Sequence, residues 1–239
     1  MSGVALNPGL SARRAAMAGC VLFNGLRTEE LDAILGHTIP RRVERNGMIM
    51  RRGDPGTGMA VILTGKVRIS LTAENGRDVT LAVLGPQDAV GEMSLLDGQP
   101  CSADATAMEE CVLLTLERGE FLRLLRSNSD LCLRLLEVLC GRLRRANAAL
   151  EDLASLDLPT RLGRLLLRLA RDYGVESVSG TRIGVRLSQK DLGALVGGSR
   201  EKVNRQLRVW EEDRALRKDS DGYLVILKPD ALEMAIPSV

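Results

Sequence analysis

Hydrophobic residues between Ile39 and Leu116 occur in short runs that are rich in β-branched side chains and separated by glycine. The runs read MIMRRGDPGTG, MAVILTGKVRISL, ENGRDVTLAVLG and CVLLTL. Residues suited to tight turns stand within or between them, at Gly53-Asp54, Gly65, Asn75-Gly76 and Gly85-Pro86. Short runs punctuated in this way predict a small antiparallel barrel or sandwich.

The pattern changes to helical periodicity from about Glu117 to Asp157. Two sets of apolar residues alternate there at spacings of three and four: Cys132, Leu139, Ala146 and Leu153 with Leu136, Leu143 and Leu150. Such a seam is typical of a coiled coil. We therefore predict a dimer interface made by Leu136, Leu139, Leu143, Ala146, Leu150 and Leu153. The alternative is a helix packed on its own domain, whose apolar stripe is usually wider.

Pro159 ends this helix in our interpretation, because proline disfavours helical backbone at the preceding residue and lacks an N–H group. A hinge is expected near Leu156 to Thr160. A further helix is predicted over Thr160 to Tyr173, and the segment TRIGVRL at 181–187 predicts a short strand.

Two short helices joined by a glycine turn follow this strand. Ser188 is a good N-cap for the first helix, and Asp191 three residues later completes a capping-box pattern. The turn at 196–199 (VGGS) leads to a second helix, predicted over Arg200 to Trp210. This is the pattern of a helix-turn-helix, to which the turn at 219–222 and the strand YLVIL add the hairpin of a wing.

The second helix carries side chains that can read DNA bases. Arg200 and Arg205 can each bind guanine O6 and N7, and Glu201 can accept a hydrogen bond from cytosine N4. Three further residues are better placed for phosphates, namely Ser199, Lys202 and Gln189. The alternative is a winged helix used only for protein contacts.

Composition is that of a globular protein, with 239 residues, 45% of them hydrophobic and 27% charged. No apolar run approaches the roughly eighteen residues that a membrane span needs, so we expect a cytoplasmic protein without a membrane partner.

The net charge of +2 is unevenly distributed: residues 1–160 hold 18 basic and 20 acidic side chains, whereas 161–239 hold 15 basic and 11 acidic side chains. Only the C-terminal part therefore leans toward a polyanion.

The five cysteines form no C-x-x-C pair, and His37 is the only histidine. This pattern argues against a disulfide framework and a zinc site, and a Ser-His-Asp triad would have to use His37. We expect no catalytic residues, no metal ligands and no enzymatic activity. The first 20 residues lack the apolar core of a signal peptide and are expected to form a flexible lead-in.

The segment LSQKDLGALVGGSREKVNRQL is similar to the helix-turn-helix of the cAMP receptor protein and fumarate-nitrate regulator (CRP/FNR) family, and matches the catabolite-activator type at Arg200, Glu201 and Arg205. The likeness extends from about Phe23 to Leu227. It implies an α+β fold with an N-terminal cyclic-nucleotide-binding-like β-barrel (jelly roll), a long dimerisation helix and a C-terminal winged helix-turn-helix. We place these parts at 21–126, 127–158 (with the hinge) and 159–239, after the lead-in at 1–20.

The resemblance also implies a homodimer on double-stranded operator DNA with half-sites of the TGTGA type, and contact with RNA polymerase. We expect a transcription regulator in which an effector, or its absence, sets the orientation of the two recognition helices through the coiled coil. The alternative from another class is a nucleotide-binding module that controls a protein partner through its winged helix.

Residues 91–103 (GEMSLLDGQPCSA) resemble the phosphate cassette of the same family. A glycine before a short helix presents backbone donors to a phosphate, Glu92 can bind a ribose 2′-hydroxyl and Ser102 can add a hydroxyl donor. Asn147, on the dimerisation helix, can reach a purine edge. The implied effector-binding residues are Gly91, Glu92, Met93, Ser94, Cys101, Ser102 and Asn147.

Two positions depart from the family pattern. The cyclic-nucleotide binders have an arginine where this chain has Cys101, so this chain lacks the strongest phosphate contact of such a pocket. The cAMP receptor protein has Thr-Ser where this chain has Ala146-Asn147. Three hypotheses stay open: a response to cAMP, cGMP or a cyclic dinucleotide, an effector-free binder, and a thiol sensor at Cys101. An iron-sulfur or haem sensor fits less well, because Cys20 stands alone near the N-terminus and His37 precedes the barrel.

Overall fold

The chain forms two compact units, Met1–Leu143 and Arg144–Val239, in a computed structural model that describes residues 9–72, 78–177 and 180–233. The division falls inside the long helix α5 (Ser129–Ser155), not after residue 158 as the sequence predicted. The last turns of α5 belong to the second unit, where Asp152 pairs with Arg164 at 2.6 Å. Pro159 therefore marks a break between helices and not the boundary between the units.

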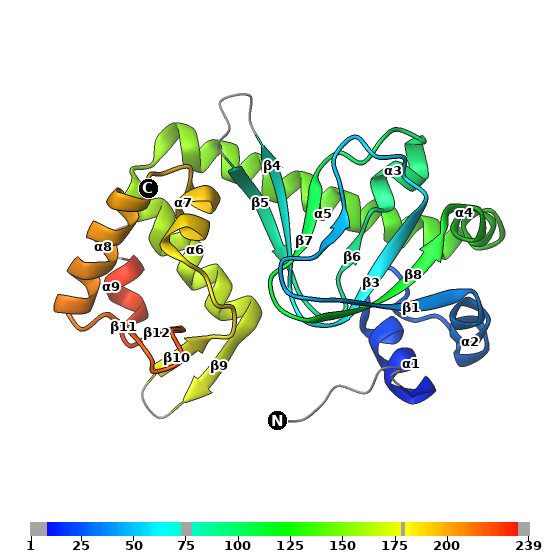
Figure 1. Ribbon diagram of the computed structural model, residues 1–239, viewed down its shortest axis with the longest axis horizontal. Helices are drawn as coiled ribbons and strands as arrows, with labels where there is room; N and C mark the ends of the chain where they lie inside the picture. Colours follow the sequence, from blue (N-terminus) through cyan, green and yellow to red (C-terminus); the bar gives the residue numbers. More distant parts are fainter. Residues whose placement is uncertain (1–8, 73–77, 178–179, 234–239) are drawn as a thin grey trace. The chain divides into compact units, whose positions relative to one another are not determined.

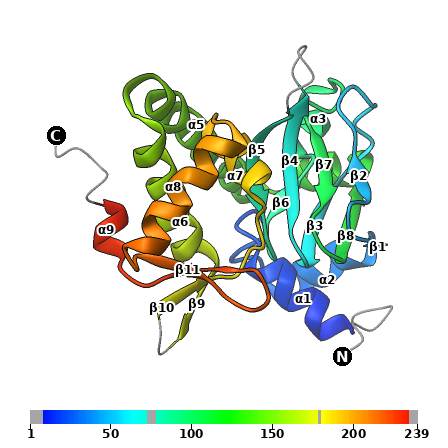
Figure 2. The same cartoon turned by 60° about the vertical axis from the view of Figure 1, so that its left-hand side comes forward.

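The first unit contains two four-stranded antiparallel sheets (Figures 1 and 2), with strand orders β1-β8-β3-β6 and β2-β7-β4-β5. The first consists of β1 (Thr38–Val43), β8 (Cys111–Glu117), β3 (Gly58–Thr64) and β6 (Ala89–Val90). The second consists of β2 (Met48–Met50), β7 (Asp104–Ala107), β4 (Val67–Thr72) and β5 (Asp78–Leu84). The predicted jelly roll is confirmed, as two sheets and not as one closed barrel. The predicted turn at Asn75-Gly76 lies outside the described residues.

Alternation along β3 divides the first unit into two cores, because successive side chains of a strand point to opposite faces. Ala60 and Ile62 pack in one cluster with residues from both sheets, such as Val67 and Ala105. Met59 and Val61 pack in the other, on the outer face of the β1-β8-β3-β6 sheet. Helices cover this outer face: α1 (Leu10–Gly19), α2 (Thr28–Gly36), α3 (Glu92–Asp97), α4 (Arg118–Ser127) and the first half of α5.

Helix α1 corrects the expectation that residues 1–20 form a flexible lead-in. Met17 and Cys20 lie three residues apart on one side of the chain and are only 1% and 2% exposed. Arg14 of α1 pairs with Asp32 of α2 at 2.7 Å. The described part of this segment is therefore packed on the first unit.

Helix α5 carries apolar residues on two faces. Leu131 and Leu135 are buried in the core of the first unit, and Leu139 packs against the same core. A second set is between 50% and 66% exposed: Leu133, Leu136, Leu143, Leu150 and Leu153. The residues of the predicted seam therefore lie in two environments. Leu139 contacts the core of its own unit, whereas the other four predicted leucines face solvent. Ala146 is exposed as well.

The second unit packs helices against a sheet of order β11-β12-β10-β9. The helices are α6 (Leu158–Tyr173), α7 (Gln189–Val196), α8 (Arg200–Glu212) and α9 (Pro229–Glu233). The strands are β9 (Gly174–Ser177), β10 (Gly180–Ile183), β11 (Leu216–Lys218) and β12 (Leu224–Ile226). The predicted wing hairpin is confirmed by β11 and β12, which pair antiparallel.

Asp157 starts α6 after the break that follows Ser155. Its carboxylate accepts a hydrogen bond from the Thr160 backbone N–H at 2.9 Å, and hydrogen bonds from the Thr160 hydroxyl and backbone lower the pKa of Asp157.

In the described ranges, no helix has the length and apolar character that a membrane crossing requires.

Candidate DNA interface and effector pocket

The helix-turn-helix is built by two serine caps and one glycine. Ser188 Oγ accepts from the Asp191 backbone N–H at 3.2 Å, and the Asp191 carboxylate accepts from the Ser188 N–H at 2.9 Å. Gly197 has φ +66°, a left-handed conformation that favours glycine, and it ends α7. Ser199 Oγ then accepts from the Lys202 N–H at 3.3 Å and starts α8. The predicted cap at Ser188 is confirmed, and Ser199 caps the second helix in the same way.

Helix α8 buries one face and exposes the other (Figure 2). Val203, Leu207 and Trp210 are at most 4% exposed and anchor the helix to its unit. The predicted base-reading residues Arg200, Glu201 and Arg205 are all exposed. They extend over the first turns of the helix, as a recognition helix requires.

Glu201 is engaged at the start of α8. Its carboxylate accepts hydrogen bonds from its own backbone N–H and from the Ser199 side chain, and these hydrogen bonds, together with the charge of Arg200, lower its pKa. The side chain is therefore ionised at neutral pH and is an acceptor only. An acceptor of this kind matches the N4 amino group of cytosine.

An open hollow follows the exposed face of α8. It is lined by Glu201, Asn204, Arg205, Arg208, Val209 and Glu212. Asn204 and Arg208 are not among the candidates predicted from the sequence. The signal was present, because both residues lie three or four positions from a predicted base-reading residue and so share its face.

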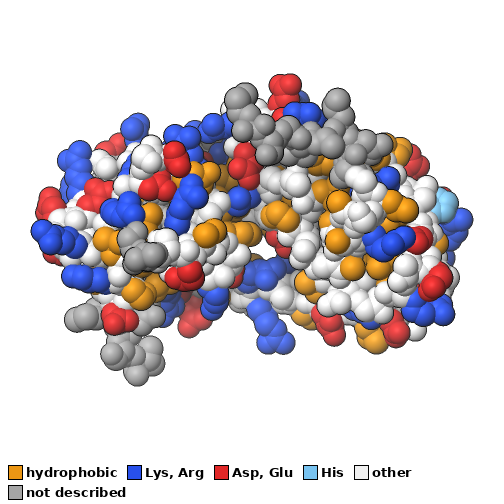
Figure 3. Space-filling view, turned by 90° about the horizontal axis from the view of Figure 1, so that it is seen from below, with side chains coloured by type: hydrophobic (Ala, Val, Ile, Leu, Met, Phe, Trp, Pro, Cys, Tyr) orange, Lys and Arg blue, Asp and Glu red, His pale blue; other side chains and the backbone are white. Residues whose placement is uncertain are grey.

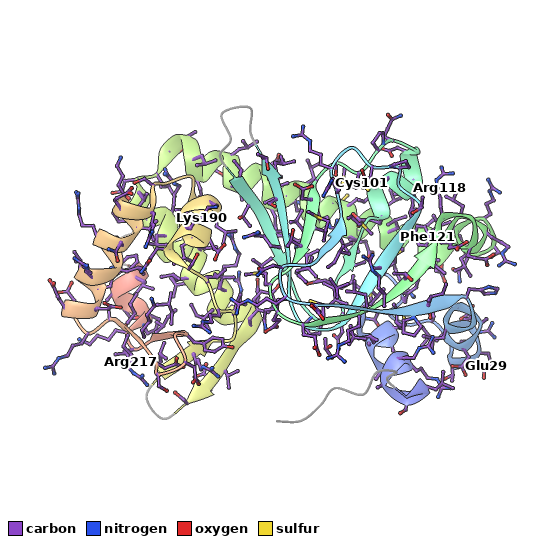
Figure 4. The ribbon with its side chains drawn as sticks, viewed as in Figure 1. Glu29, Cys101, Arg118, Phe121, Lys190 and Arg217 are labelled. Carbon is purple, nitrogen blue, oxygen red and sulfur yellow. The ribbon has the colours of Figure 1, made fainter. Side chains whose placement is uncertain are left out.

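The predicted phosphate-contacting residues lie at the starts of the two helices. Ser199 and Lys202 are exposed at the start of α8, and Gln189 is half-buried at the first position of α7. Figure 4 labels two further basic side chains of this unit, Lys190 on α7 and Arg217 on β11. Basic and acidic side chains are interspersed on the face drawn in Figure 3.

The predicted effector-binding residues Gly91 to Ser94 form the tight turn into α3. Gly91 has φ +91°, a left-handed conformation that favours glycine, and a Cβ there would lie 3.0 Å from the Gly58 carbonyl oxygen. Glu92 and Ser94 are 1% and 4% exposed. Met93 is exposed, and its sulfur lies 3.9 Å from Ser102 Oγ.

Glu92 is the principal polar group of this turn. Its Oε1 forms an ion pair with Nη1 of Arg142, whose Nη2 donates to the Ala89 carbonyl at 2.6 Å. Its Oε2 is buried and has no hydrogen-bond partner among the described residues. A buried carboxylate is costly unless its oxygens are satisfied, so Oε2 is suited to receive a hydroxyl donor.

Arg142 is a site residue that is not among those predicted from the sequence. The signal was the helical spacing, because Arg142 follows Leu131, Leu135 and Leu139 at intervals of four, four and three. These positions share the face of α5 that packs on the first unit.

Cys101 lies in the loop after α3 and is half-buried (Figure 4). Its backbone N–H donates to the Asp54 carbonyl at 2.8 Å, and its carbonyl accepts from the Gly53 N–H at 2.9 Å. The loop is thus anchored, but a thiol cannot form the bidentate phosphate contact of an arginine. Asn147 is exposed on α5 and belongs to the second unit, whereas the other predicted effector-binding residues belong to the first.

Comparison with known families agrees with both units. Residues 40–128 match the cyclic nucleotide-binding domain, and residues 160–235 match the Crp-like helix-turn-helix domain.

Individual relatives and a solved structure extend this result. The chain is 31% identical to the CRP-like cAMP-activated global transcriptional regulator of Mycobacterium tuberculosis, over 87% of this chain and 93% of that protein. It is 36% identical to the cyclic AMP receptor protein of Thermus thermophilus, over 84% of this chain and 90% of the relative. The structure of the c-di-GMP responsive global regulator CLP of Xanthomonas campestris aligns with a TM-score of 0.71 and 26% identity, over 84% of this chain and 99% of that one.

These relatives are transcription regulators without enzymatic activity, as the sequence predicted for this protein. With the cyclic nucleotide-binding domain, the Crp-like helix-turn-helix and this likeness along most of its length, the chain belongs to the CRP/FNR family of bacterial transcription regulators.

Proposed function

We propose that the protein acts as a homodimer on a TGTGA-type palindrome and that a cyclic nucleotide bound at Glu92 controls its affinity for DNA. The observation that carries the DNA part is the exposure of Arg200, Glu201 and Arg205 at the capped start of α8. Arginine and glutamate at these positions suit the G·C pairs of such a half-site.

The exposed leucines of α5 support the homodimer. Leu136, Leu143 and Leu150 recur every seven residues and are between 56% and 66% exposed in the single chain. Large apolar side chains at this period are typical of a coiled-coil seam. A two-fold dimer would present one recognition helix to each half of a palindrome, and the bound dimer would regulate transcription through contact with RNA polymerase.

The buried and unpartnered Oε2 of Glu92 supports the effector part. It would accept a hydrogen bond from a ribose hydroxyl, and Arg142 supplies positive charge beside it. The named relatives respond to cAMP or to c-di-GMP. We therefore take cAMP, cGMP and cyclic di-GMP as the candidate effectors.

Fluorescence anisotropy of a labelled duplex with two inverted TGTGA half-sites tests the proposal. Wild-type protein is titrated at fixed salt with and without each nucleotide. We expect tight binding and at least a tenfold gain in affinity with one nucleotide. The double variant Arg200→Ala/Arg205→Ala should fold normally, because both arginine side chains are exposed. It should lose the preference for the palindrome over a scrambled duplex.

A second candidate function is effector-independent binding, and the Arg142–Glu92 pair favours it because the protein already satisfies one carboxylate oxygen. Tight binding that no nucleotide changes would establish this second function. Absence of any preference for the palindrome would contradict both and would support a winged helix that docks a protein partner.

A further inference from the structure

We propose that Asn204 is an additional base-reading residue, which gives each half-site a preference for an A·T pair beside the pairs read by Arg200, Glu201 and Arg205. The inference rests on the proposed DNA-binding function and deepens it. It concerns sequence specificity alone and is independent of the effector.

Asn204 lies among the predicted base-reading residues. It follows Arg200 by four positions and Glu201 by three, and residues at these spacings are neighbours on a helix surface. It lines the same hollow as Glu201 and Arg205. The stripe that reads DNA therefore passes over Asn204.

Asn204 lies far enough along the helix axis from Arg200 to reach a different base pair. Four residues of α-helix rise about 6 Å, whereas successive base pairs are about 3.4 Å apart. Asn204 and Arg200 are thus separated by more than one base step. Arg208, one turn further on, has a longer side chain with a permanent charge and is better suited to a phosphate.

The chemistry of the side chain selects the base. An asparagine amide has one acceptor and two donors in a plane, and it pairs with N6 and N7 of adenine in the major groove. In the ranges that the structure describes, the Asn204 side chain makes no hydrogen bond with the protein, so folding does not use its amide. Gln206 has the same functional group on α8 but does not line the hollow, and it offers a matched control.

Selection from duplexes with one randomised half-site tests the inference, using the full-length wild type, Asn204→Ala and Gln206→Ala. We expect wild type and Gln206→Ala to prefer an A·T pair at one position by roughly 5- to 150-fold. Asn204→Ala should lose this preference and keep the preferences at the other positions. An unchanged preference in Asn204→Ala would overturn the inference.

The variant Asn204→Arg separates loss of specificity from loss of folding. Arginine pairs with O6 and N7 of guanine, so the preference at that single position should change from A·T to G·C. A misfolded protein cannot acquire a new preference. If Asn204→Arg binds with the wild-type preference, Asn204 does not read a base. If wild type selects no sequence at all, the proposed function itself is wrong.

Discussion

Glu92 on α3 and Arg142 on α5 form an ion pair in which the glutamate is 1% exposed and the arginine side chain 29%. The pair joins the turn that follows Gly91 to the helix whose exposed leucines form the proposed dimer seam. A ligand whose hydroxyl donates a hydrogen bond to Glu92 would therefore contact a carboxylate that is already paired with Arg142 of α5. Such a contact is a direct physical route by which an effector would bias the position of the dimerisation helix.

Replacement of this carboxylate should weaken the nucleotide response. Glu92→Gln removes the charge that Arg142 faces and weakens the acceptor for a ribose hydroxyl. Loss of a hydrogen bond to a charged group costs about 1.5–3 kcal/mol, which is roughly ten- to a hundredfold in affinity. Isothermal titration with the activating nucleotide measures the change. The exposed carboxylate of Asp97 in the same helix gives the control Asp97→Asn, and equal affinities of the two variants would contradict the assignment.

A charge in the exposed leucine stripe should dissociate the dimer. Leu143 is 61% exposed in the single chain, so Leu143→Glu leaves the fold of the protomer intact. Two carboxylates buried at a two-fold seam cost several kcal/mol, which raises the dimer Kd by at least about a hundredfold. Sedimentation velocity at micromolar concentration should show a monomer. Leu81→Glu, at an apolar residue of β5 that is 55% exposed, is the control and should remain dimeric.

Loss of the α8 cap should destabilise the DNA-binding unit selectively. Ser199→Ala removes the side-chain acceptor for the Lys202 N–H, at a cost of about 0.5–2 kcal/mol. Trp210 is the only tryptophan and is buried on α8, so its fluorescence reports unfolding of this unit. We expect the Tm of the DNA-binding unit to fall by roughly 4–8 °C for each kcal/mol of stability lost. Ser220→Ala, at an exposed serine in the wing turn, should leave Tm unchanged.

Burial should make Cys20 unreactive. Desolvation raises the pKa of its thiol from its ordinary value of 9.0 to about 11. Near pH 8 the folded protein therefore has roughly a hundredfold less thiolate at Cys20 than the unfolded chain. Peptide mass spectrometry after timed iodoacetamide treatment, with and without urea, measures the ratio, and equal rates would contradict it. Because the folded pKa is raised, the stability that this thiol contributes is present below pH 9 and is lost as pH rises toward 11.

Local patterns were enough for much of the architecture. The serines at 188 and 199 and the glycine at 197 act on neighbouring backbone groups, so their positions predicted the helix-turn-helix without knowledge of distant contacts. The strands of the first unit followed in the same way from alternation and turn residues. The resemblance to a known family added the order of the domains and the effector-binding segment.

Other features depended on contacts between residues far apart in the chain. Leu139 and Leu143 belong to one periodic pattern, yet only the packing of α5 on the first unit shows that Leu139 faces a core and Leu143 solvent. Helix α1 was missed because its burial depends on α2 and on β3.

Backbone propensities and helical spacing were sufficient to predict the two kinds of domain, the recognition helix and the residues on its exposed face. The pairing of Arg142 with Glu92 could not be predicted from local patterns, because the two residues are 50 positions apart and meet through packing of the fold. Periodicity shows which side chains share a face of a helix. The packing of the whole unit decides what that face contacts, which can be an apolar core, a buried carboxylate or water.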